Sequence, residues 1–144
     1  MKEKIKKYID LIPRDKLPKW EKVLQDEIGK VTLKNVLSCL VEKGIVLDQY
    51  DQMEQILLGI EDTLTTEQIM LYVEPILYTD DWNSIRWALK RGVPVDVIKH
   101  IANGSFTTEK LRQVERKYFE EKHEKDKKAF IDSLLSDEEN VEEE

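Results

Sequence analysis

A helical pattern that recurs between Gln52 and Phe119 constrains this chain more than any other feature. It fills segments 52–80 and 81–109 and the start of a third, 110–119, so its period is 29 residues. A fixed period of this length is typical of stacked two-helix units. We therefore expect an all-α fold with stacked helix-pair repeats over residues 45–119. At the 29-residue shift the following apolar positions coincide: Met53/Trp82/Leu111, Ile56/Ile85/Val114, Ile60/Leu89/Tyr118, Leu64/Val93, Ile69/Ile98 and Leu77/Phe106.

Helix boundaries inside the repeat follow from a few residues. Thr65 and Gln68 predict a capping box at the start of the first unit's second helix, and Pro94 takes the place of Thr65 in the next unit. Gly59 and Ala88 share a slot, where a small side chain lets a neighbouring helix approach closely.

Residues 1–44 precede the repeat and match it poorly at the 29-residue shift. Their apolar spacing predicts about three helices, which end at Pro13, Gly29 and Gly44, with Thr32 as the cap of the third. We expect an N-terminal helical subdomain, which is either a cap on the stack or a small bundle of its own.

The C-terminal part is predicted to be a long helix that starts near Thr108. Residues 120–128 contain no apolar side chain, residues 129–135 form a short apolar patch, and residues 136–144 form an acidic tail that we expect to be disordered. The patch either folds back onto the body or docks on another chain.

A set of residues within the repeat follows a further recurring pattern. In the first unit these are Gln52, Met53, Ile56, Gly59, Ile60, Glu61, Tyr72, Val73 and Pro75, and in the second unit Ile85, Arg86, Leu89, Ile101 and Ala102. Trp82, Ala88 and Gly104 depart from the pattern. The pattern resembles degenerate repeats of about this length in low-GC Gram-positive bacteria and in their phages and mobile elements. The resemblance covers about half the chain, and it implies a stacked helical scaffold, a phage or mobile-element setting and no catalytic residues.

Charge and composition limit the classes of partner. The chain has 144 residues and a net charge of −7; its first 35 residues are net positive, and residues 36–109 are net negative. An acidic middle disfavours an extended nucleic-acid groove, which needs clustered cations. We expect no membrane span and no secretory signal, and the single cysteine, Cys39, fits a cytoplasmic protein.

Residues that could support catalysis are sparse. His100 and His123 lie far apart, and neither has a second histidine or a cysteine one helical turn away. We expect His100 to be partly buried and structural. No phosphate loop, dinucleotide fingerprint or serine elbow appears, so we expect no enzyme activity, no cofactor and no metal site.

Positions whose character changes between units are the candidates for function. One slot holds Leu58, Trp87 and Arg116 in the three segments. Trp87 lies off the apolar stripe, so it either packs against the adjacent repeat or forms a partly exposed anchor beside basic residues; tryptophan and arginine are the types that anchor protein interfaces. The predicted partner-binding residues are Leu58, Arg86, Trp87, Arg91, Arg116, Phe130 and Leu134.

Two functional hypotheses follow from these patterns. The first is a non-catalytic interaction protein that binds a protein partner, such as a small phage or mobile-element regulator or inhibitor of a host machine. A homodimer through the C-terminal segment belongs to the same class. The alternative is a nucleic-acid-linked protein, which either mimics DNA through its acidic middle or binds DNA through its basic N-terminal helices.

Overall fold

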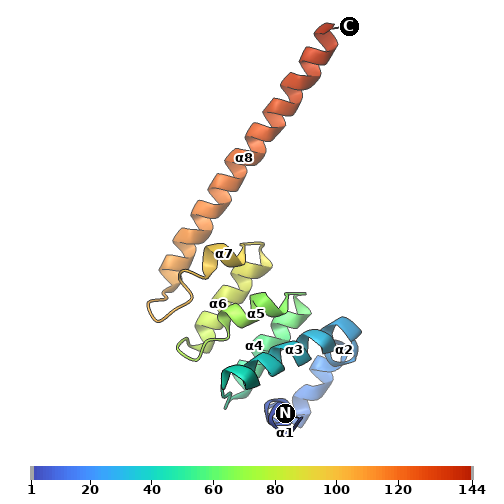
Figure 1. Cartoon of the computed structure of the whole chain (residues 1–144), viewed down its shortest axis with the longest axis vertical. Helices are drawn as coiled ribbons and strands as arrows, with labels where there is room; N and C mark the ends of the chain where they lie inside the picture. Colours follow the sequence, from blue (N-terminus) through green and yellow to red (C-terminus); the bar gives the residue numbers. More distant parts are fainter. Residues whose placement is uncertain (1, 144) are drawn as a thin grey trace.

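The computed structural model describes the backbone of residues 2–143 and the side chains of residues 2–136. Within these ranges the chain forms helices and no strands, which confirms the all-α class. The helices step from α1 at one end of the molecule to the long helix α8 at the other (Figure 1). One hydrophobic core runs from Tyr8 to Leu111. The N-terminal helices therefore share this core with the rest of the body.

Residues 2–43 form α1 (Lys2–Ile9), the 3₁₀ helix η1 (Arg14–Trp20), α2 (Glu21–Gln25) and α3 (Glu27–Lys43). The predicted boundary at Gly29 is wrong, as is the cap at Thr32, because α3 begins earlier. Asp26 caps α3 by accepting a hydrogen bond from the Gly29 amide, 2.8 Å away. Gly29 is kept small by packing, since a Cβ there would lie 2.7 Å from the Val23 carbonyl oxygen.

The predicted end of α3 at Gly44 is confirmed. Gly44 adopts a left-handed conformation (φ 69°), and the Ile45 amide donates back to the Leu40 carbonyl. A glycine reaches this conformation at no steric cost, so the chain turns sharply there. The turn sends residues 45–49 back past α1, where the Tyr8 hydroxyl donates to the Ile45 carbonyl.

The middle of the chain forms α4 (Tyr50–Glu61), α5 (Thr66–Tyr72), α6 (Thr79–Lys90) and the short α7 (Val95–Ile98). The predicted capping box at Thr65 and Gln68 is present. Gly59 has the predicted role: a Cβ there would collide with the Tyr72 hydroxyl and with Ile69. The same hydroxyl donates to the Gln55 carbonyl, so α5 is held against α4.

Two rows of helices build the body. Helix α3 packs on α5, and α5 packs on α7; helix α4 packs on α6, and α6 packs on α8. Adjacent members of the two rows also touch, as α5 and α6 do. Of the residues that the 29-residue shift places together, Met53, Trp82 and Leu111 are all buried, whereas Val114, Tyr118 and Phe106 are less buried than their counterparts in the earlier units. The repeat arrangement stays a prediction.

Helix α8 (Thr108–Glu143) starts against α6 and α7 and then projects away from the body (Figure 1). Tyr118 and Phe119 are the last of its side chains that pack on the core. At 1.5 Å per residue the part beyond Phe119 is about 35 Å long. The predicted disordered tail, 136–144, lies outside the residues whose side chains are described, except Ser136. None of the described helices is both long and apolar enough to cross a bilayer.

Candidate protein-interaction face

Trp87 is the partly exposed tryptophan of the body. It is 43% exposed, whereas Trp20 and Trp82 are buried at 0% and 1%. The burial of Trp82 is confirmed and has a simple cause: with Ile85 and Leu89 it forms the apolar stripe of α6 at i, i+3 and i+7. Trp87 lies off that stripe, as its spacing predicts. The open choice for Trp87 is thus resolved in favour of partial exposure.

Two cations hold the indole ring of Trp87. The Lys90 Nζ lies 4.8 Å from the ring centroid, and the Arg86 Cζ lies 5.2 Å from it. Both distances fall within the range of cation–π attraction, which is worth about 0.5–1 kcal/mol per pair at exposed sites. Both cations also bind the carboxylate of Asp62: the Arg86 Nη1 lies 2.5 Å from it, and the Lys90 Nζ lies 3.0 Å from it. The ring therefore lies against a charge cluster formed by Arg86, Lys90 and Asp62.

Arg86 does not lie on the surface, contrary to its predicted place among partner-contacting residues. It is 4% exposed. Its Nε donates to Gln55, 3.0 Å away, and a terminal nitrogen donates to Asn83, 2.8 Å away. A buried guanidinium is tolerated when its donors are paired in this way. Arg86 thus contacts the Trp87 ring from the interior side of the fold and is not available to touch a partner.

Asp62 is the residue that sequence reasoning missed. It is the C-cap of α4, and it binds Arg86 of α6. One level further along the stack, Arg91 is the C-cap of α6 and binds Glu115 of α8 at 2.5 Å. The 29-residue shift maps Asp62 onto Arg91 and Arg86 onto Glu115. The two ion pairs thus occupy equivalent positions with their charges exchanged. Aligning the sequence at the 29-residue shift places an acid opposite a base at both positions, so the ion pair could have been found from the sequence.

The other predicted partner residues fall into two groups. Leu58 is half-buried on α4, Arg91 is exposed as the C-cap of α6, and Arg116 is exposed on α8. With Trp87 and Lys90 they belong to α4, α6 and α8, the successive helices of one row, and we call this set of residues the Trp87 face. Phe130 and Leu134 lie on the projecting part of α8 and are 64% and 48% exposed. The structure therefore does not bring these two residues together with the others.

No three residues among those described are placed to hold a metal ion. His100 is exposed beyond the end of α7, so its predicted burial is wrong; α7 stops at Ile98 and leaves His100 in a turn. Burial raises the pKa of the Tyr72 phenol far above its ordinary value. A tyrosine that stays neutral and donates to a backbone carbonyl is a packing element.

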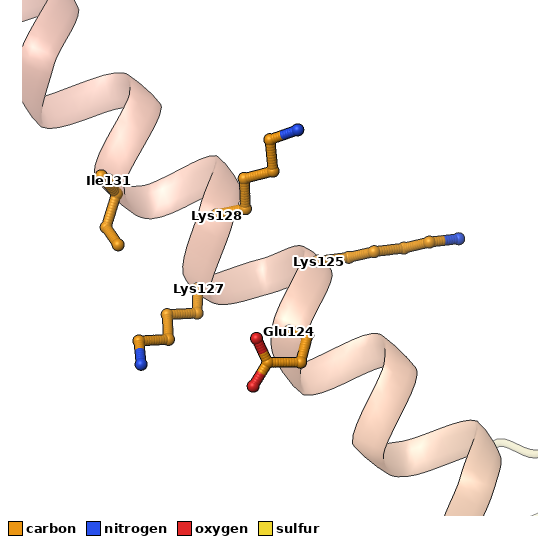
Figure 2. Close-up of a pocket in the computed structure, with 5 residues that line it drawn as sticks. All are labelled: Glu124, Lys125, Lys127, Lys128 and Ile131. Atoms are coloured by element: carbon orange, nitrogen blue, oxygen red, sulfur yellow. The ribbon is translucent and has the colours of Figure 1, made fainter.

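One surface depression is formed by a single helix. It is lined by Glu124, Lys125, Lys127, Lys128 and Ile131, which all come from α8 (Figure 2). Lys127 and Ile131 point to one side of the helix, while Lys125 and Lys128 point to the other. A single helix provides no opposite wall, so this region is an open helix surface.

Comparison of the chain with protein-family models, with curated proteins and with solved structures finds no match.

Proposed function

We propose that this chain is a non-catalytic helical interaction protein that binds a protein partner through the Trp87 face. The single observation that carries the proposal is a tryptophan, 43% exposed, that contacts two cations of its own helix. Large aromatic side chains that are already ordered lose little entropy on binding and are the usual anchors of interfaces. The chain would act by occupying a surface of its partner.

The charge of the face indicates the chemistry of that partner. Lys90 lies 4.8 Å from the Trp87 ring centroid, Arg91 comes one helical turn after Trp87, and Arg116 takes the same slot on α8, although the chain as a whole has a net charge of −7. Asp62 and Glu115 offset part of the positive charge of these three residues. A partner that fits would offer an apolar pocket for the indole with carboxylates at its rim. Complementary charges of this kind raise the association rate and select the partner.

The resemblance to repeats of low-GC Gram-positive bacteria and their mobile elements suggests the setting. We propose a cytoplasmic phage or mobile-element protein that regulates or inhibits a host machine. Blocking a surface of such a machine needs no catalytic group.

Affinity capture from lysates of low-GC Gram-positive bacteria, with identification by mass spectrometry, tests the proposal. The native chain is compared with Trp87→Ala and with Tyr78→Ala. Tyr78 is a matched control, because it is an exposed aromatic residue next to the other end of α6. We expect one protein to be retained by the native chain and by Tyr78→Ala, and to be lost with Trp87→Ala. Retention by all three chains would contradict the proposal.

Binding to random duplex DNA provides the decisive counter-test. Phosphate contacts release counterions, so DNA affinity falls steeply with salt. We expect no measurable DNA binding at low salt. Tight, strongly salt-dependent binding would instead favour the nucleic-acid alternative.

A further inference from the structure

The projecting part of α8 carries an apolar patch that nothing in the described chain covers. Phe130, Ile131, Leu134 and Leu135 are between 44% and 64% exposed. They lie beyond Phe119, where the helix has already left the body (Figure 1). They occupy i, i+1, i+4 and i+5 and therefore form one face of the helix. A face of this kind on a free helix is suited to pairing with a second helix.

We propose that the occupant is the α8 helix of a second copy of this chain, paired in antiparallel orientation. This proposal does not depend on the Trp87 face, which lies on the body.

The patch is self-complementary in one register. If residue i of one copy lies opposite residue 265 − i of the other, Phe130 meets Leu135 of the second copy, and Ile131 meets Leu134. The crossing point then falls in the middle of the patch. Ile131 and Leu134 are three residues apart, the spacing that forms the seam of paired helices.

Charge complementarity selects the antiparallel orientation. The stretch before the patch contains Lys122, Lys125, Lys127 and Lys128, and the sequence after it, 137–144, has acidic residues and no basic ones. In the proposed register Lys127 comes level with position 138 of the second copy, Lys128 with 137, and Lys122 with 143; all three positions are acidic. Lys127 and Ile131 also point to the same side of the helix (Figure 2). A parallel pair would instead set lysines beside lysines and acids beside acids, which is repulsive.

The length of the projection fits the same arrangement. Helix α8 is described to Glu143, and in this register that position comes level with Lys122 of the second copy. The two projecting helices can therefore overlap between these positions, and the two bodies lie at opposite ends of the pair. The overlap is about 33 Å long. Its apolar centre is short, so we expect a reversible dimer that salt weakens.

Sedimentation velocity over a concentration series, at low and high salt, tests self-association. Ile131→Glu places a charge in the patch, and Ile28→Glu is the matched control, since Ile28 is an exposed isoleucine on α3. We expect a dimer whose dissociation constant rises at least about tenfold with Ile131→Glu and stays unchanged with Ile28→Glu. A monomer up to about 1 mM, or equal effects of the two substitutions, would overturn the proposal.

Spin labelling at one position distinguishes the orientations. A Glu121→Cys variant in a Cys39→Ser background carries one label per chain, because Cys39 is the sole cysteine. In the antiparallel dimer the two labelled positions lie about 35 Å apart along the helix axis. In a parallel dimer they would lie about 10 Å apart, the spacing of packed helices. Electron paramagnetic resonance distance measurements, which include double electron–electron resonance for the long range, distinguish the two cases. A distance near the short value expected for a parallel pair would refute the antiparallel pairing even if the chain is dimeric.

Discussion

Replacing Arg86 with methionine is expected to destabilise the fold far more than replacing Arg91. Arg86 is buried with Asp62, whose side chain is 8% exposed. Removing one partner of a buried ion pair typically costs about 3–5 kcal/mol, because it leaves the other charge uncompensated. Lys90 stays 3.0 Å from Asp62 and keeps part of that compensation, so we expect about 3 kcal/mol. For a chain of this size that loss lowers the melting temperature by roughly 6–12 °C.

Arg91→Met is the matched control. It removes the equivalent arginine one level further along the stack, but the Arg91 side chain is 47% exposed. Exposed ion pairs contribute about 0–1 kcal/mol. Urea unfolding followed by far-ultraviolet circular dichroism measures both free energies. We also expect the Arg86→Met/Asp62→Asn pair to cost less than the sum of its single substitutions, with a coupling of about 1–3 kcal/mol. Equal losses for the two arginines, together with strict additivity, would refute the stabilising role of the buried cluster.

Two further predictions concern the contact between α4 and α5. Gly59→Ala should lower the free energy of unfolding by about 1–3 kcal/mol despite alanine's better helix propensity, because the added Cβ meets the Tyr72 hydroxyl. In that background Tyr72→Phe should restore part of the lost free energy, as measured by urea unfolding. An unchanged free energy of unfolding in Gly59→Ala would contradict the close packing at this position. Burial raises the pKa of Tyr72 in the folded state. The contribution of Tyr72 to stability is therefore complete below the unfolded pKa of about 10 and declines as pH rises above it. When unfolding is measured at a series of alkaline pH values, the free energy of unfolding should decline less for Tyr72→Phe than for the native chain, and equal declines would contradict this prediction.

The interior of the fold was predictable because its signal is local and periodic. The positions shared by the units, such as Met53, Trp82 and Leu111, are buried as expected, since a helix with apolar residues at this spacing must cover that face. Gly44 was equally readable, because a glycine after an apolar stripe supplies the left-handed turn that ends a helix.

The failures share a different physical origin, which is contact between residues distant in the sequence. Gly29 has the type of a helix stop, but its role is set by the Val23 carbonyl that packs against it. Arg86 has the type of a surface residue, but Asp62, Gln55 and Asn83 together satisfy its charge in the interior. Residue type alone does not reveal such partners. The 29-residue alignment would have revealed the ionic partner, Asp62, because it places Asp62 opposite Arg91 and Arg86 opposite Glu115.

The projecting helix illustrates a third case. The sequence left two options for residues 120–135, folding back or docking on another chain. The structure extends α8 away from the body, with Phe130 and Leu134 exposed. Residues 120–128, before the patch, have no apolar side chain that could pack on the body. The helix therefore gains nothing by folding back onto it.

Photo-crosslinking from position 116 in host cells tests directly whether the Trp87 face binds a protein partner. Arg116 is exposed and occupies the slot on α8 that Trp87 occupies on α6, so a crosslinking residue there samples the same face. We predict a discrete adduct with a different protein that persists in the Tyr78→Ala background and disappears with Trp87→Ala. An adduct that is indifferent to Trp87→Ala, or no adduct in cells where the chain is abundant, would contradict the account.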